Sequence, residues 1–142
     1  MPLPLLWVIC AMDEQDAVLE ANQAFYEAFA AGDMPTMEAI WSTGQDLACI
    51  HPGWQALVDR NAVMESWRSI LASPPPVRCI GARAFVNTTL AHVICYEGIG
   101  EGMLVATNIF RKEEGGWRVI HHQAGPATSV QEATPPSDSR VH

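Results

Sequence analysis

The sequence has few charged residues, and acidic ones outnumber basic ones. Charged residues make up 17% of the 142 residues, with 16 acidic against 8 basic side chains and a formal net charge of −8. An acidic chain repels phosphate backbones, so the composition argues against nucleic acid as a partner. The low charge fraction leaves much of the surface apolar, which favours an interface with a second copy of the chain.

Long hydrophobic runs are also missing. The apolar start, MPLPLLWVICAM, is far shorter than the roughly 20 residues that span a bilayer. It lacks the basic start and the small-residue cleavage site of a signal peptide. We therefore predict no membrane segment and a cytoplasmic location, with residues 1–12 as an extension ahead of the domain.

The cysteines are too far apart for a zinc ribbon. They stand at positions 10, 49, 79 and 95, and the last three lie in strand-like runs. We interpret those three as buried free thiols in a reducing compartment. Cys49 and His51 alternate to the same strand face, so a Cys–His nucleophile is conceivable, although a buried thiol is poorly suited to it.

Signatures of cofactor chemistry are absent too. The sequence has no glycine-rich phosphate loop and no Gly-x-Ser-x-Gly elbow. No two histidines stand at i, i+4 on a predicted helix, so the possible ligands His51, His92, His121 and His122 make a weak metal set. We predict that neither a metal nor an organic cofactor is required.

Three helices are predicted in the first half of the chain. Apolar residues recur at helical spacing over 13–31, with Asp13 as the cap and Gly32 as the stop. A shorter helix is expected over 33–42 and a third over 59–73, where a triple proline follows. A short strand, DLACIH, lies between the second and third helices.

The second half has strand character. Residues 77–87, 89–99, 102–112 and 117–123 are rich in β-branched and aromatic residues and are separated by Asn and Gly turns. Helices followed by hairpins predict an α+β fold, with three helices on one face of a curved antiparallel sheet. A long helix across a bent sheet leaves a cone, which is a natural pocket. Residues 128–142 are predicted to be a loose tail.

Four stretches carry a family resemblance: ANQAFYEAFAAGDM, CIHPGW, VMESW and ATNIFRKEEGGWRVIHHQAGP. In this order they resemble the SnoaL-like branch of the nuclear transport factor 2 superfamily, over residues 13–127. The resemblance implies a cone-shaped α+β (cystatin-like) domain, usually a homodimer packed through the open sheet. That superfamily holds isomerases, dehydratases, cyclases and non-catalytic association domains, so the resemblance leaves the function open.

The ketosteroid isomerases of that superfamily provide a comparison. Their general base corresponds to His51 here, while their oxyanion tyrosine would fall on Phe25 and their protonated aspartate near Met103. Both oxyanion donors are therefore missing at the matching positions. Loss of one such donor costs about 10²–10³ in rate, so steroid-type isomerisation is disfavoured.

His51 is the principal candidate of the site. The following proline holds its backbone extended, and a neutral imidazole can accept or donate a proton near pH 7. The plainer interpretation is that His51 only ends a strand by bonding a neighbouring carbonyl. We also expect the cone to be lined by Phe25, Phe29, Trp41, Trp54, Asn108 and His122, with Trp67 in the core.

His121 and His122 are adjacent on a strand, so one should face the cone and the other the opposite side. In the resembling sequences the histidine pair sits one residue later, so His122 matches the first histidine and Gln123 replaces the second. Strand parity places Asn108 on the face opposite Thr107. The sequence does not decide which histidine of the pair faces inward.

Three functions remain open from the sequence. The chain is expected to be a homodimer that binds a small apolar molecule in its cone. It could instead be a non-catalytic association module, or a cofactor-free lyase, isomerase or cyclase with His51 as the general base.

Overall fold

The computed structural model describes residues 13–128. The predicted extension at 1–12 and most of the predicted tail lie outside these residues. The helices are α2 (Glu14–Ala31), α3 (Met34–Ile40) and α4 (Arg60–Leu71). The strands are β1 (Ala48–Ile50), β2 (Val77–Asn87), β3 (Leu90–Ile99), β4 (Gly102–Glu113) and β5 (Gly116–Pro126).

Each helix begins at an aspartate that caps it. Asp13, Asp33 and Asp59 accept hydrogen bonds from backbone N–H groups three residues ahead, at 2.8, 3.1 and 2.8 Å. Such caps satisfy amide groups that have no partner within the helix. Gly32 ends α2 in the left-handed conformation, with φ 67°. The predicted helix over 33–42 is shorter than expected, because Trp41 is already extended and bridges to Val119 on β5.

The five strands form one sheet in the order β1-β5-β4-β3-β2. Strands β2 to β5 are antiparallel hairpins, as predicted. The expectation of a wholly antiparallel sheet is wrong at one edge, where β1 pairs parallel to β5. The reason is topological: β1 precedes the hairpins in the chain and joins their last strand along its free edge.

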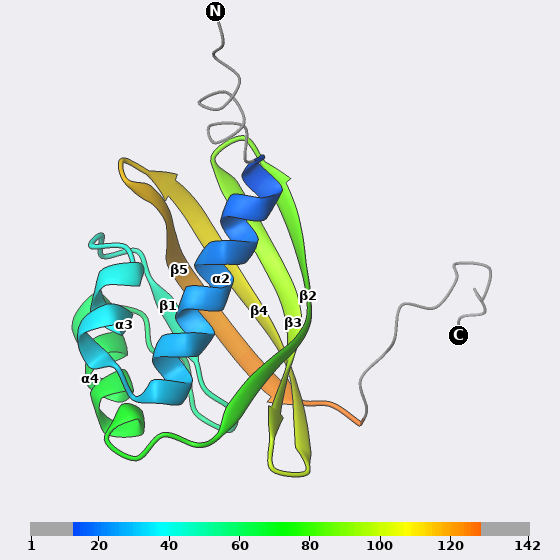
Figure 1. Cartoon of the computed structure of the whole chain (residues 1–142). Coiled ribbons are helices and arrows are strands. Elements are labelled where there is room, and N and C mark those ends of the chain that lie inside the picture. Colours follow the sequence, from blue (N-terminus) through cyan, green and yellow to red (C-terminus); the bar gives the residue numbers. More distant parts are fainter. Residues whose placement is uncertain (1–12, 129–142) are drawn as a thin grey trace, which may run out of the picture.

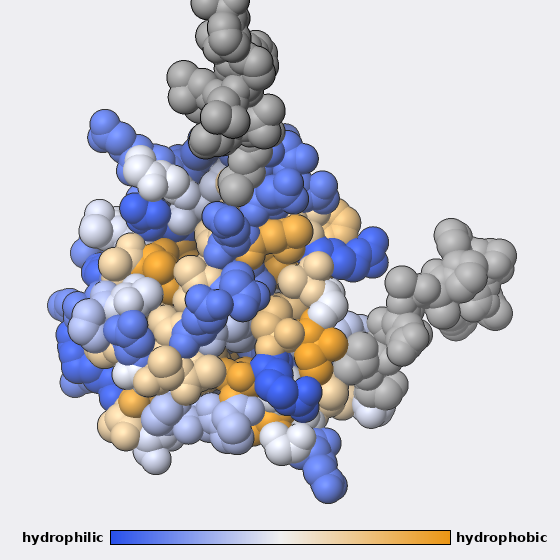
Figure 2. Space-filling view, in the orientation of Figure 1, coloured by the Kyte–Doolittle hydropathy of each residue, from blue (hydrophilic) through white to orange (hydrophobic). Residues whose placement is uncertain are grey.

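The three helices lie on one face of the curved sheet, with the long helix α2 running across it (Figure 1). This confirms the predicted α+β class. On the face that carries α2, hydrophobic residues appear in separate patches between hydrophilic ones (Figure 2). No helix formed by residues 13–128 has the length and apolar character needed to cross a membrane.

Strand alternation divides the sheet into an inner face, beneath the helices, and an outer face. On β3, Val93, Cys95 and Glu97 are buried, while His92 and Ile94 are exposed. The register then sets Asn108 beside His122 on the inner face of β4 and β5. The inner face therefore carries several polar side chains into the core.

Candidate functional site

His51 lies inside the cone, at the end of β1. It is only 3% exposed, and its Nε2 is 2.9 Å from Ser66 Oγ on α4. The Ser66 hydroxyl donates to the Val63 carbonyl at 2.7 Å. The one proton of the Ser66 hydroxyl is used in this bond, so Ser66 can only accept from His51. His51 therefore carries its proton on Nε2, which donates to Ser66, and its lone pair on Nδ1. His51 is held as a neutral base with Nδ1 available.

Burial keeps His51 neutral. Loss of solvation lowers its pKa to about 4, because a buried site disfavours the charged imidazolium. A neutral imidazole at pH 7 can accept a proton but does not donate as an imidazolium.

Trp54 covers His51 from the solvent side. Its ring stands edge-on to the imidazole, with centroids 4.8 Å apart, and it is 45% exposed. The tight turn through Pro52 and Gly53 holds it there, through a hydrogen bond of 2.9 Å from Trp54 N to the His51 carbonyl. Trp54 is therefore a half-exposed residue at the edge of the buried interior.

His122 is the inward member of the histidine pair. It is 1% exposed, and its ring centroid lies 6.2 Å from that of His51. Burial is the largest cause that lowers its pKa, to about 3, followed by repulsion from His51 and His121. His121 faces the outer side of the sheet, and burial lowers its pKa as well. The structure thus resolves the choice that the sequence left open.

A hydrogen-bonded network continues from His122 across the inner face. His122 Nδ1 donates to Asn108 Oδ1 at 2.5 Å, and Asn108 Nδ2 donates to Asn22 Oδ1 at 2.9 Å and to the Tyr26 hydroxyl at 3.2 Å. Tyr26 donates in turn to Glu97 Oε2 at 2.6 Å. Every donor in this chain has an acceptor, which is the condition for burying such groups.

Glu97 is the functional candidate that the sequence analysis missed. It is 2% exposed, its Oε2 lies 3.8 Å from His122 Nε2, and burial raises its pKa. A raised pKa favours the protonated form, which is a proton donor. The signal was available, because Glu97 occupies the same strand parity as the buried Val93 and Cys95.

Tyr26 was also missed. The position that matches the isomerase tyrosine is Phe25, and Phe25 packs against His122 with centroids 5.1 Å apart. The hydroxyl comes instead from the next residue on α2, where Tyr26 reaches Glu97. Burial is the main cause that raises the pKa of Tyr26, so it stays protonated. The interior therefore has a tyrosine–carboxyl pair, although not at the compared positions.

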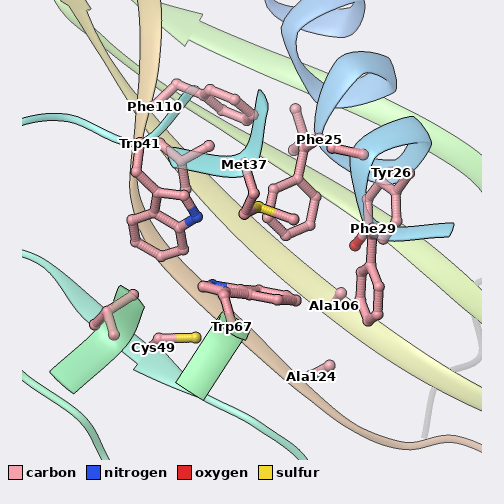
Figure 3. Close-up of a cluster of buried hydrophobic side chains, with 14 of the residues drawn as sticks. Phe25, Tyr26, Phe29, Met37, Trp41, Cys49, Trp67, Ala106, Phe110 and Ala124 are labelled. Carbon is pink, nitrogen blue, oxygen red and sulfur yellow. The ribbon is translucent and has the colours of Figure 1, made fainter. Parts of the chain in front are cut away.

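Trp67 stands at the centre of this interior. Its ring lies 4.9 Å from the centroid of His51 and 5.7 Å from that of His122. Figure 3 shows it reaching from α4 toward Phe25 and Phe29. Trp67 is core, as predicted, and it also contacts both histidines. The indole N–H groups of Trp41 and Trp67 are buried without a partner among residues 13–128.

The expected cone residues are packed against one another. Phe25, Phe29 and Trp41 are buried in the core cluster, together with Met37 and Trp67. Four surface hollows are lined by described residues, and none of these four includes His51, Asn108 or His122. The structure brings His51, Asn108 and His122 together in the buried interior.

One hollow lies directly outside His51. It measures about 290 Å³ and is lined by Trp54, Leu57, Ala62, Glu65, Ser66 and Ser69. Ser66 lines this hollow and also accepts the hydrogen bond from His51. Trp54 and Ser66 thus both line the hollow and contact His51.

Among residues 13–128, no three His, Cys, Asp or Glu side chains converge as metal ligands do. Cys49 Sγ lies 3.5 Å from His51 Nε2. Burial raises the pKa of the Cys49 thiol well above its ordinary value, so the thiolate needed for nucleophilic attack is strongly disfavoured. Cys49 and His51 are therefore in contact, but the raised pKa of the thiol argues against a Cys–His nucleophile.

The fold and the polar interior define a cone-shaped α+β domain of the nuclear transport factor 2-like superfamily. The sequence profile of the SnoaL-like domain matches residues 18–129. The chain belongs to this SnoaL-like family.

Solved structures agree with this assignment. A "putative dehydratase" of the NTF2-like family from Streptomyces avermitilis is 32% identical, with a TM-score of 0.74, over 80% of this chain and 96% of that one. A "putative calcium/calmodulin-dependent protein kinase type II association domain" from Thiobacillus denitrificans is also 32% identical, with a TM-score of 0.66, over 76% of this chain and 93% of that one.

A curated relative is more distant. The F-box protein SKIP8 of Arabidopsis thaliana is 20% identical over 112 residues, which are 76% of this chain and 48% of that protein. The chain thus spans about half the length of this relative.

Proposed function

We propose that this domain binds a small, mostly apolar molecule in its cone and moves a proton on it, as a cofactor-free lyase or isomerase. The observation that carries the proposal is that one buried interior holds histidines with lowered pKa values and a glutamate with a raised pKa. His51 and His122 have pKa values of about 4 and about 3, whereas the pKa of Glu97 is raised. Groups whose pKa values are displaced in opposite directions suit general acid–base catalysis.

The roles follow from the hydrogen bonds. His51 Nδ1 would remove a proton from a carbon beside a carbonyl group. Glu97 would return a proton, directly or through Tyr26, to a leaving hydroxyl or to the enolate oxygen. Removal of one proton and one hydroxyl eliminates water, while removal and return of a proton shifts a double bond. The resemblance to a protein named a putative dehydratase favours the first reaction.

Two buried indole N–H groups indicate which hydrogen-bonding group a ligand should carry. Trp41 and Trp67 bury N–H donors with no partner among the described residues, and leaving such a donor unpaired costs about 1–3 kcal/mol. An oxygen acceptor on the ligand would satisfy one or both. We therefore expect an apolar molecule that carries a carbonyl oxygen.

Access would pass through the Trp54 turn. His51 is 3% exposed, so a ligand that reaches it must displace a side chain, and Trp54 is the half-exposed side chain that touches it. The hollow beside it lies on the outer side of the same contact. Rotation of Trp54 would join the hollow to the imidazole without breaking the core.

The test is ligand binding with matched histidine variants. A library of small carbonyl compounds is screened by thermal shift, and each hit is titrated calorimetrically against His51→Ala and His92→Ala. His92 stacks on Phe85 on the outer face of the sheet. We expect His51→Ala to weaken binding at least tenfold, or about 1.4 kcal/mol, while His92→Ala binds as the parent does. Equal binding by all three proteins would refute the proposal.

A second candidate, a dimerisation module, rests on the outer face of the sheet. Large hydrophobic side chains are exposed there: Phe85, Leu90, Ile94 and Val105. A hollow of about 470 Å³ between β2, β3 and β4 has apolar lining from Phe85, Leu90 and Ile109. We propose that a second copy of the chain covers this face. The resemblance to a protein named an association domain supports it.

A further inference from the structure

Two cysteines of neighbouring strands meet on the inner face. The register pairs Cys79 of β2 with Glu97 of β3, so Cys95 is the diagonal neighbour of Cys79. Diagonal neighbours across a sheet are about 7–8 Å apart at Cα, slightly more than the separation that most disulfides span, so a bridge here needs a small backbone movement. The register irregularity between Ile80 and Arg83 gives β2 local freedom to close the remaining distance.

Hydrogen bonds link both thiols to the polar network beneath α2. Asn22 Nδ2 donates to Cys79 Sγ at 3.6 Å, and the Cys95 thiol donates to the Tyr26 hydroxyl at 3.4 Å. The two thiols are close enough for each to shift the pKa of the other. The single Cys95 proton goes to Tyr26.

The two thiols differ in the way that an attacking and a resolving cysteine differ. Cys79 is partly exposed, and the neighbouring Cys95 thiol is the largest cause that lowers its pKa. Cys95 is fully buried, and the same contact, together with burial, raises its pKa. Thiolate character and access determine which cysteine reacts first with an oxidant.

We propose that Cys79 and Cys95 form a redox modification site, a reversible disulfide that joins β2 to β3 beneath α2. The oxidant is a peroxide, represented by hydrogen peroxide. The Cys79 thiolate attacks one peroxide oxygen, the O–O bond breaks, and hydroxide leaves and takes up a proton to become water. Cys79 is then a sulfenic acid.

The second step closes the bridge. Cys95 sulfur attacks Cys79 sulfur, the S–O bond breaks, and hydroxide leaves with the Cys95 proton as water. In sum, two thiols and one peroxide give one disulfide and two waters, and a thiol reductant reverses the change. Oxidation removes the Cys95 proton that Tyr26 accepts, so the network around Glu97 loses a donor. This site does not depend on the catalytic proposal.

Peptide mapping tests the site on the full chain. The protein is reduced, freed of reductant and exposed to hydrogen peroxide, and its remaining thiols are alkylated before trypsin digestion. Cleavage after Arg78, Arg83 and Arg111 places the two cysteines in different peptides, 79–83 and 84–111, while Cys10 and Cys49 share 1–60. We expect the cross-linked pair 79–83/84–111, lighter by two hydrogen atoms, and its disappearance after dithiothreitol.

Matched variants assign the roles. Cys49→Ala removes a buried thiol that is outside the pair and should leave the rate of bridge formation unchanged within about twofold. Cys95→Ala should stop at a sulfenic acid on Cys79 that dimedone traps, and Cys79→Ser should abolish both products. In the parent chain, Cys79 should be consumed at least about tenfold faster than Cys49. A peroxide product that links Cys79 to Cys10, or an intact Cys79 when Cys49 is already oxidised, overturns the proposal.

Discussion

At the scale of single residues, the protonation states of the interior are fixed by partners rather than by residue type. Ser66 commits its proton to the Val63 carbonyl, and this sets the tautomer of His51. His122 gives its Nδ1 proton to Asn108, which leaves Nε2 toward Glu97. Both histidines stay neutral at pH 7, because their pKa values lie well below it.

Acid should destabilise the fold through these histidines. Their folded pKa values, about 4 and about 3, lie below the unfolded value, so the stability they contribute is present above about pH 6.5 and is lost as pH falls. Between the unfolded and the folded pKa, each histidine lowers the free energy of unfolding by about 1.4 kcal/mol for every pH unit that the solution becomes more acidic. Urea unfolding followed by fluorescence at several pH values between about 7 and 5 should show this loss. A flat profile would contradict the burial of neutral histidines.

Glu97 contributes with the opposite sign. Its folded pKa is raised, so its stabilising effect is complete below the unfolded pKa of about 4.5 and is lost as pH rises through the folded value. Glu97→Gln keeps an acceptor for Tyr26 and removes the titration. We expect the variant to lose stability more steeply than the parent as pH falls from about 6.5. Superimposable pH profiles would show that Glu97 is not protonated in the fold.

Sequence reasoning reached part of this site and missed the rest. The proline after His51 fixed its backbone and indicated an inward side chain, and the adjacent histidines had to diverge across the sheet. Strand parity placed Glu97 with the buried Val93 and Cys95, but a glutamate in a strand and a tyrosine on an amphipathic helix are ordinary surface residue types until their partner is known. Their contact joins positions 71 residues apart, which no local pattern shows.

At the scale of elements, caps and stops made the helices predictable. Asp13 and Gly32 flank α2 at the predicted positions, because their side-chain and backbone requirements are local. The parallel pairing of β1 with β5 was not predictable in the same way, since a three-residue strand carries no signal of its partner. The partner and direction of such a short edge strand are set by contacts with the rest of the fold.

The stop of α2 should be especially sensitive to substitution. At Gly32, φ is +67° and an added Cβ would lie 2.9 Å from the Leu71 carbonyl oxygen at the end of α4. Gly81, with φ +65°, has nothing within 4 Å, so Gly81→Ala measures backbone strain alone. Strain at positive φ costs about 1–2 kcal/mol, and Gly32→Ala should lose more than Gly81→Ala in urea unfolding. Equal losses would mean that the α2–α4 contact is loose.

At the scale of the whole molecule, the two faces of the sheet differ in what they expose to solvent. The helices cover the inner face (Figure 1). The outer face exposes hydrophobic side chains that a single copy leaves in water, and an antiparallel sheet of this kind is stable with one wet face only when that face is polar. The predicted homodimer explains this composition.

The dimer can be tested by charge insertion. Ile94, 37% exposed at the middle of the outer face, is replaced by lysine, and Val58, 64% exposed in the loop before α4, is the control. The parent and Val58→Lys should scatter light as particles of twice the 15.5 kDa chain mass, and Ile94→Lys should approach the single mass. A parent that is monomeric at micromolar concentration would contradict the proposal.

The central claim is that ligands enter the cone between His51 and His122, and histidine-selective NMR tests it most directly. His51 and His122 face inward, while His92 and His121 lie on the outer face of the sheet. During titration with carbonyl compounds from the screen, we expect the imidazole signals of His51 and His122 to shift and those of His92 and His121 to stay. Hits that move only the outer pair, or a library that moves neither inner histidine, would contradict the account.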